Sequence, residues 1–268
     1  MNILEVSNIS KTISNKRLIN DVSFSVCEGK IIGLVGNNGA GKSSILKAIT
    51  GLFRIDDGKI VINGYDLSKE PFEALKCVGA TIENNEFYDF LSGYDNLYIY
   101  SENQRALQNT IEFIGLEKDI FKKVSTYSLG MKSRLSLGIA LINNPDLIIL
   151  DEPTNGLDPK GIIELRNKLL SLKKNRKAII ISSHLLSEIE KICDEIYFVK
   201  DGMIIEKVIV KSQKDNLEDI YNRVEKEYYE EKYLCWINKN SKEKKFRDIC
   251  LFFVSDNHSF NFVSEKWF

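Results

Sequence analysis

The chain of 268 residues has few of the side chains that build metal sites or disulfide frameworks. Its two histidines lie far apart in the sequence, which argues against a zinc site. No two of its five cysteines have a C-x-x-C spacing; they are Cys27, Cys77, Cys193, Cys235 and Cys250. An odd, dispersed set of this kind indicates reduced thiols in a cytosolic protein.

Long apolar runs are also missing. No apolar stretch approaches the ~20 residues that cross a bilayer. The first residues, "MNILEVSNIS", have neither the basic region nor the apolar run of a secretion signal. With four prolines and a net charge of −1, nothing indicates a proline-rich linker or a basic surface for nucleic acid. These absences predict a cytoplasmic protein that does not cross a membrane by itself.

The first part of the chain alternates between strand and helix patterns. "LINDVSFSV" (18–26) alternates like a strand, and "KIIGLVG" (30–36) is a continuous apolar run typical of a buried strand. "SSILKAITGLF" (43–53) has helical spacing of its apolar residues. "GKIVINGYDL" (58–67) predicts a short strand closed by a turn at Asn63-Gly64. The order is therefore strand, glycine-rich loop, helix.

The spacing of apolar residues changes in the later part of the chain. Residues from about 84 to 145 have a predominantly helical pattern, and short apolar runs at 147–150, 178–181 and 195–199 are then separated by helical segments. This alternation predicts a parallel sheet with right-handed crossovers. From 207 onward, a helix near 215–230 and three short strands, "YLCWI", "DICLFFV" and "FNFV", predict a small α+β extension, 207–268.

The glycine-rich loop matches G-x-x-x-x-G-K-[ST] in full, with Gly36, Asn37, Asn38, Gly39, Ala40, Gly41, Lys42 and Ser43, followed by Ser44. Its glycines let backbone N–H groups curl around phosphates, and the next helix N-terminus adds positive potential. We expect Lys42 to neutralise the β- and γ-phosphates of a nucleotide and the Ser43 hydroxyl to bind Mg²⁺.

An acidic pair follows the apolar strand in "LIILDEP". Asp151 at the strand end would place a carboxylate beside Mg²⁺, at the carboxyl edge where α/β proteins bind ligands. Glu152 comes next and can polarise an attacking water as a general base. Together with the phosphate loop, this pair predicts a nucleotide-hydrolase site.

Just upstream, "TYSLGMKSRLSLGIAL" (126–141) resembles the signature of ATP-binding-cassette proteins, usually Leu-Ser-Gly-Gly-Gln before a helix. The matching positions are Tyr127, Ser128, Leu129, Gly130 and Met131. "TNGLDP" resembles the D-loop of the same family, with Asp158 as its aspartate, and "IIISSH" ends in His184 at the position of the switch histidine. The resemblance covers about residues 2–206.

This resemblance implies a P-loop α/β cassette with a parallel-sheet ATPase core, an N-terminal antiparallel β portion and a helical subdomain at about 84–145. It implies ATP and Mg²⁺ as cofactors, Glu152 and His184 as catalytic residues, and Ser128 and Gly130 facing the ATP of a second cassette. A homodimer is favoured over a heterodimer. A separate transmembrane permease would hold the chain at the inner face of the membrane.

The sequence departs from the family pattern at two other places. Ile13 stands where an aromatic residue usually stacks on adenine, and Glu83 stands where a glutamine usually contacts Mg²⁺ and the membrane partner. Glu83 and the Tyr-Ser-Leu-Gly-Met signature resemble the branch that exports bacitracin-like and lantibiotic peptides. The alternatives are an ATPase of this type that acts on ribosomes or DNA, and a regulatory module that binds ATP without hydrolysing it.

Overall fold

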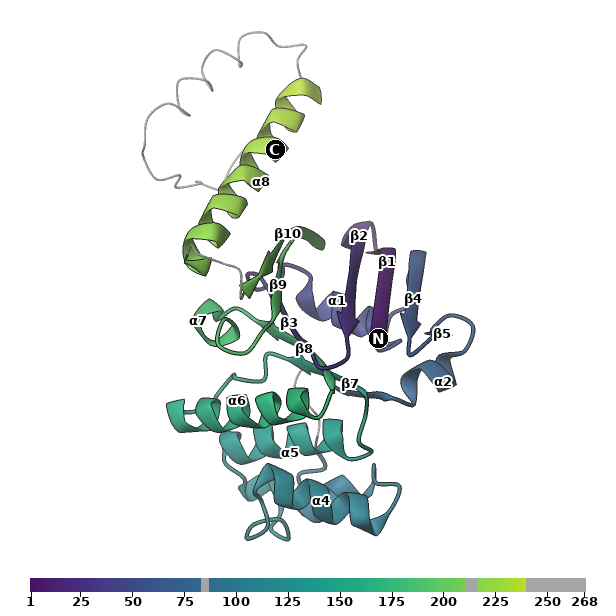
Figure 1. Cartoon of the computed structure of the whole chain (residues 1–268), viewed down its shortest axis with the longest axis vertical. Coiled ribbons are helices and arrows are strands. Elements are labelled where there is room, and N and C mark those ends of the chain that lie inside the picture. Colours follow the sequence, from purple (N-terminus) through teal and green to yellow (C-terminus); the bar gives the residue numbers. More distant parts are fainter. Residues whose placement is uncertain (83–86, 211–215, 240–268) are drawn as a thin grey trace. The chain divides into compact units, whose positions relative to one another are not determined.

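The computed structural model describes residues 1–82, 87–210 and 216–239, the last five by their backbone alone (Figure 1). The chain divides into two compact units, Met1–Ile220 and Tyr221–Phe268. The first unit contains two sheets and a group of helices. Within the described residues, no helix combines the length and the apolar character needed to cross a bilayer.

The N-terminal sheet is antiparallel, as predicted. It consists of β1 (Asn2–Ile13), β2 (Lys16–Cys27), β4 (Asp57–Ile62) and β5 (Tyr65–Asp66), in the order β2-β1-β4-β5. Val22, Phe24 and Val26 of β2 are buried and alternate with exposed residues, so one face of the hairpin joins the core. Ser14 and Asn15 both have positive φ, which suits the tight turn between β1 and β2.

The second sheet carries the predicted parallel core. Its strands are β3 (Ile31–Val35), β6 (Val78–Thr81), β7 (Leu147–Asp151), β8 (Ala178–Ser183), β9 (Glu195–Lys200) and β10 (Met203–Ile209). Their order is β10-β9-β3-β8-β7-β6, and β10 alone among them runs antiparallel to its neighbour. All residues of β3 and β8 are buried, as expected for strands covered on both faces. The carboxyl ends of β3, β7 and β8 therefore lie at one edge.

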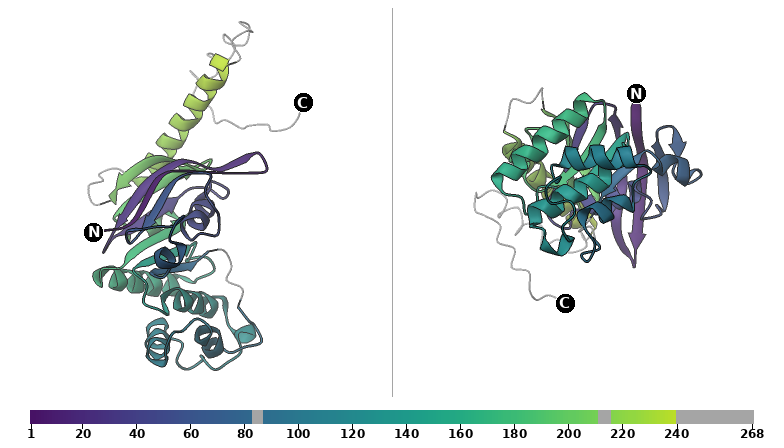
Figure 2. Two further views of the ribbon diagram at one scale, coloured as in Figure 1. Left: turned by 90° about the vertical axis from the view of Figure 1, so that its right-hand side faces the viewer. Right: turned by 90° about the horizontal axis from the view of Figure 1, so that it is seen from below.

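Helices cover this sheet. α1 (Lys42–Ile49) follows the phosphate loop, and its Leu46 shares one core with Val26 of the antiparallel sheet and Ile149 of β7. α2 (Pro71–Leu75) precedes β6, α6 (Pro159–Lys174) lies between β7 and β8, and α7 (Leu186–Ile189) follows β8. Two further views show these layers (Figure 2). The core thus fixes the strand ends that meet at the site.

The segment predicted to be helical contains α3 (Gly93–Tyr98), α4 (Gln104–Ile114), a 3₁₀ turn η1 (Val124–Thr126) and α5 (Leu129–Leu141). Ser92 and Asp95 form a capping box at α3, and Gly115 ends α4 in the left-handed region. These helices have their own core, which includes Leu97, Ile111 and Leu135. They form a separately packed layer that carries the signature residues.

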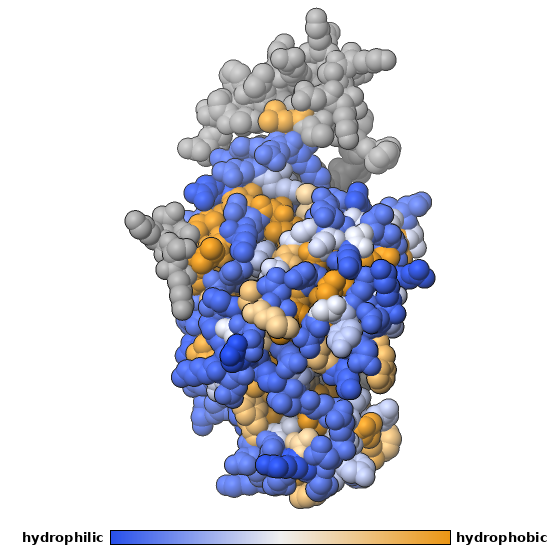
Figure 3. Space-filling view, turned by 45° about the vertical axis from the view of Figure 1, so that its right-hand side comes forward, coloured by the Kyte–Doolittle hydropathy of each residue, from blue (hydrophilic) through white to orange (hydrophobic). Residues whose placement is uncertain are grey.

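Aromatic side chains are exposed on this helical layer. Tyr94 stacks on Tyr98 and on Phe121, with ring centroids 6.3 and 5.2 Å apart, and Phe90 and Phe121 are 70% and 75% exposed. On the face drawn in Figure 3, hydrophobic side chains gather in separate patches among hydrophilic ones.

At the C-terminal end, α8 (Leu217–Lys239) covers the predicted helix from Leu217 to residue 230, and Leu217, Ile220 and Val224 are buried. The strand predicted from "YLCWI" (233–237) is wrong, because α8 continues through it. A five-residue apolar run does not reveal its period, and the preceding Glu- and Lys-rich turns favour helix. The other two predicted strands lie outside the described residues. β10 spans the predicted boundary at residue 206.

Asp194, just before β9, joins three elements through its carboxylate. The side chain is 4% exposed, lies 2.6 Å from Lys173 Nζ and 3.5 Å from Lys30 Nζ, and accepts a 3.0 Å hydrogen bond from the Ile31 N–H. Burial works to raise the pKa of Asp194. The hydrogen bonds from Lys173 and Ile31 and the charges of both lysines outweigh burial, so this pKa is lowered.

We expect Asp194→Asn to lower the free energy of unfolding by about 2 kcal/mol at neutral pH, because the buried carboxylate loses its charge-assisted hydrogen bonds to the partly exposed ammonium of Lys173 and to the Ile31 N–H. A pKa lowered by folding stabilises the chain above the unfolded value of about 3.9, and this stabilisation is lost as the pH falls through the folded pKa. Urea unfolding of both proteins should therefore show a difference that shrinks below about pH 4. A difference that stays constant on acidification would contradict this role.

Candidate active site

The phosphate loop, residues 36–43, connects β3 to α1 and has a shape that requires its glycines. A Cβ on buried Gly36 would overlap the Val199 carbonyl oxygen of β9. Gly39 and Gly41 have φ values of +83° and +107°, in the region that side chains avoid. Gly41 occupies the N-cap of α1 without a side-chain cap, so the first N–H groups of α1 have no capping side chain.

Residues distant in the sequence pack against the backbone of this loop. The Gly202 N–H, in the turn between β9 and β10, donates to the Ala40 carbonyl at 2.7 Å. A Cβ on Gly41 would lie 2.8 Å from Gly202 Cα and 3.1 Å from the Leu18 carbonyl oxygen. The loop therefore rests on the β9–β10 turn and on β2, and sequence reasoning did not identify either support.

Lys42 turns its ammonium group back into the loop. The residue is 5% exposed, and Nζ donates to the carbonyls of Gly36 at 2.6 Å and Asn37 at 3.4 Å. Nζ also lies 3.3 Å from Glu152 Oε1. The cation is thus held where a phosphate bound by the loop would meet it.

Asp151 ends β7 and Glu152 follows it, as predicted, and β7 pairs with β8. The Ser182 hydroxyl, directly opposite Asp151 in the pairing of the two strands, donates to Asp151 Oδ1 and accepts a 2.8 Å hydrogen bond from the Glu152 N–H. Ser182 was missed from the sequence. Its signal was weak: a polar pair, Ser182-Ser183, closing an otherwise apolar strand.

Glu152 adopts a positive φ of +48°, which is strained for a residue with a Cβ. Its Oε2 lies 2.8 Å from His184 Nδ1. Its Oε1 is buried and, among the described residues, has no hydrogen-bond partner beyond the 3.3 Å approach of the Lys42 charge. The structure therefore brings Lys42, Glu152 and His184 together, as a general base with an oriented imidazole requires.

The five signature residues surround the start of α5. The Ser128 side chain caps the helix by accepting from the Met131 N–H at 3.3 Å, while Leu129 is 60% exposed. Tyr127 is buried and donates from its hydroxyl to the Asp119 carbonyl at 2.8 Å; burial, with the charge of Asp119, raises the pKa of Tyr127. This segment, including Leu129 and the following turn of α5, contacts the turn at 153–157 of the same chain.

The remaining predicted residues lie on different elements. Asp158 caps α6 by accepting from the Gly161 N–H at 2.7 Å. Ser44 lies in the first turn of α1, and Ile13 ends β1 beside the hairpin turn with 41% of its surface exposed. Glu83 lies outside the described residues.

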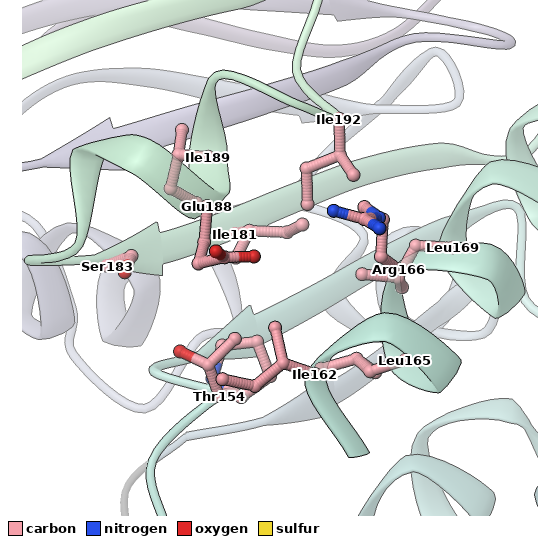
Figure 4. A pocket seen from close by; sticks show the side chains of 11 residues that line it. Thr154, Ile162, Leu165, Arg166, Leu169, Ile181, Ser183, Glu188, Ile189 and Ile192 are labelled. Carbon is pink, nitrogen blue, oxygen red and sulfur yellow. The ribbon is translucent and has the colours of Figure 1, made fainter. Parts of the chain in front are cut away.

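A pocket of about 20 Å³ lies between the start of the turn after Glu152, α6, β8 and α7 (Figure 4). Thr154, Ser183, Glu188 and Arg166 line it together with apolar residues, and no phosphate-loop residue does. Its volume suits about one water molecule rather than a nucleotide. Thr154 Oγ1 is buried and, in the described part of the chain, lacks a hydrogen-bond partner.

The residues at the sheet edge fit a nucleoside triphosphate and Mg²⁺. The uncapped N-terminus of α1 and the buried ammonium of Lys42 suit phosphate oxygens. The Ser43 hydroxyl and the Asp151 carboxylate are oxygen donors of the kind that Mg²⁺ takes. No three His, Cys, Asp or Glu side chains cluster for a metal within the described residues.

Comparisons with known proteins agree with this geometry. The family model described as ABC transporter matches residues 19–155. The lantibiotic transport ATP-binding protein SrtF of Streptococcus pyogenes is 40% identical over 227 residues, 82% of this chain and 96% of that protein. The bacitracin transport ATP-binding protein BcrA of Enterococcus faecalis is 39% identical over 212 residues, 77% of this chain and 69% of that protein.

A solved structure, described as an ATP-binding subunit of an ABC transporter, superposes on this chain with a TM-score of 0.76. It is 27% identical and covers 83% of this chain and 99% of its own. The residues matched by the family model include the phosphate loop, the signature and the strand that ends in Asp151.

Proposed function

Since this chain belongs to the ABC transporter family and is an ATP-hydrolysing member of it, we propose that it powers a membrane exporter of antimicrobial peptides. The observation that carries the proposal is the 40% identity to a lantibiotic transport protein along 96% of that protein's length. A bacitracin transport protein at 39% identity points to the same cargo class, a membrane-active peptide. These relatives favour transport over an action on ribosomes or DNA.

In this proposal, the phosphate loop binds the triphosphate through its N–H groups and Lys42 carries the compensating charge. Ser43, Asp151 and Glu83 would hold Mg²⁺, which supplies charge neutralisation when bound. Glu152 takes the proton of the attacking water. His184, with Nδ1 2.8 Å from the Glu152 carboxylate, would hold that base in place and contact the γ-phosphate and the attacking water.

We further propose that two such chains, of which a homodimer is the simpler case, close on two ATP molecules. Ser128 and Gly130 of each chain would face the γ-phosphate bound by its partner, because the start of α5 offers helix N–H groups to an anion. Asp158 would lie at the contact between the chains. Since only the triphosphate state bridges both surfaces, hydrolysis would reopen the pair.

A transmembrane permease would be the second partner and would place the chain at the cytoplasmic face of the membrane. Exposed aromatic residues of the helical layer, such as Phe90 and Phe121, support a protein contact there. Ile13 would offer adenine an aliphatic surface in place of a stacked ring. The second unit of the chain, from Tyr221, has no role in this proposal.

The export function predicts a resistance phenotype. Cells that lack the gene should become more sensitive to bacitracin-like or lantibiotic peptides, because these peptides accumulate at the membrane when export stops. The wild-type gene should restore resistance, and a gene encoding Glu152→Gln should not. Inhibitory concentrations across a peptide panel, with an antibiotic that acts inside the cell as a control, measure the effect. Unchanged values across the panel would remove the export role and leave the ATPase.

A further inference from the structure

The turn that follows Glu152 is short and has a residue with positive φ at each end, of which the non-glycine residue Glu152 is strained. The Asn155 N–H donates to the Glu152 carbonyl at 3.1 Å, and the Leu157 N–H donates to the Thr154 carbonyl at 3.2 Å. Glu152 has a φ of +48° and Gly156 a φ of +74°. Gly156 therefore lies close to Glu152, in a segment that two backbone hydrogen bonds hold together.

Leu129 of the signature packs directly on this turn. A Cβ placed on Gly156 would lie 2.6 Å from Leu129 Cγ and would overlap Leu129 Cδ2, so the leucine side chain occupies the space above the glycine backbone. Next to it, a Cβ on Gly130 would lie 3.8 Å from Leu157 Cδ2. Leu129 nevertheless remains 60% exposed. It contacts the turn on one side and is open to a second molecule on the other.

Polar contacts further along α5 also join this helix to the turn and to α6. The Ser133 hydroxyl donates to the Pro153 carbonyl at 3.4 Å, and Arg134 pairs with Glu164 of α6 at 2.6 Å. Pro153 and Thr154 of the same turn also line the pocket of about 20 Å³ shown in Figure 4.

We propose that Leu129 is a positioning residue for Glu152: it transmits the engagement of the signature to the catalytic turn of the same chain. This inference rests on the proposed function, in which the signature meets the partner's nucleotide. Contact of Ser128 and Gly130 with that nucleotide shifts the exposed Leu129, and Leu129 shifts Gly156 and the turn. One ATP site thereby adjusts the base of the other, and linkage makes the influence mutual.

A double-mutant cycle tests the contact. Gly156→Ala should lower ATP turnover by about tenfold, because its Cβ overlaps Leu129 and its φ is unfavourable. Leu129→Ala should recover part of that loss in the double variant, since it empties the overlapped space but leaves the unfavourable φ. Ile163→Ala, which removes an exposed aliphatic side chain from α6, is the matched control and should recover none. Circular dichroism and calorimetric titration with ATP should show folded chains that bind nucleotide.

Cooperativity separates positioning from a purely structural role. Leu129→Ala alone should bring the dependence of turnover on ATP concentration close to non-cooperative behaviour, with the ATP affinity of the single chain unchanged. Independent, multiplicative effects of the two substitutions on turnover, or unchanged cooperativity, would overturn the inference. The absence of turnover in the wild type would instead overturn the proposed function. Thermal unfolding of the wild type, the two single variants and the double variant still reports the contact between the two residues without hydrolysis.

Discussion

Replacing Lys42 with alanine is expected to lower the ATP affinity of the chain at least about 100-fold, through the loss of charge-assisted hydrogen bonds of about 1.5–3 kcal/mol each. The buried ammonium is held by the Gly36 carbonyl and offsets the nearby Glu152 carboxylate. Without it, the triphosphate would face that carboxylate uncompensated. Isothermal titration calorimetry with ATP, or with a slowly hydrolysed analogue, measures the change.

Lys47→Ala provides the matched control for this experiment. Lys47 lies in the same helix, but its ammonium lies 5.4 Å from the centre of the Phe53 ring, on a side chain outside the phosphate loop. Its loss should leave the ATP affinity unchanged. Near-normal affinity in Lys42→Ala, or equal losses in the two variants, would contradict the assignment of the loop as the nucleotide site.

Glu152→Gln should reduce the turnover of ATP by about 10²–10⁴-fold, the usual contribution of a positioned general base. The amide has nearly the shape of the carboxylate and can still bond to His184, so the ATP affinity should persist. It cannot accept a proton from water. ATP-bound pairs of the chain should therefore accumulate, and size-exclusion chromatography with light scattering, in ATP and Mg²⁺, would detect them.

Glu188→Gln is the comparison variant for this result. Glu188 is a nearby carboxylate paired with Lys191 at 2.7 Å, and its neutralisation should leave turnover within a few tenths of a logarithmic unit. Rapid turnover by Glu152→Gln, together with a chain that stays single in ATP, would assign the general base to another group.

Local patterns in the sequence predicted where most of the candidate site residues lie in the fold. The phosphate loop depends on eight consecutive residues, and the positions of Asp151 and His184 depend on short apolar runs that end abruptly. Because parallel strands bring their carboxyl ends to one edge, these separate motifs had to converge. The observed 2.8 Å contact between Glu152 and His184 follows from that convergence.

Features that depend on pairing between distant segments could not be predicted in this way. The role of Ser182 follows from its register opposite Asp151, and the contact of Leu129 with Gly156 follows from the packing of α5 on the D-loop turn. The strand expected at 233–237 failed for the opposite reason. Local apolar character suggested a strand there, while the longer helical context determined the structure.

The contacts that shape the phosphate loop determine whether this motif can be transferred to another protein. Position 36 requires a glycine because the Val199 carbonyl lies too close for a Cβ. Position 41 is crowded in the same way by Gly202 and the Leu18 carbonyl. These contacts come from β9, from the β9–β10 turn and from β2, elements separated by more than half of the chain. An eight-residue graft of 36–43 into an unrelated scaffold would carry the glycines without the surfaces that shape them. A transplant that retains nucleotide binding would have to include the N-terminal hairpin and the β9–β10 hairpin as one module.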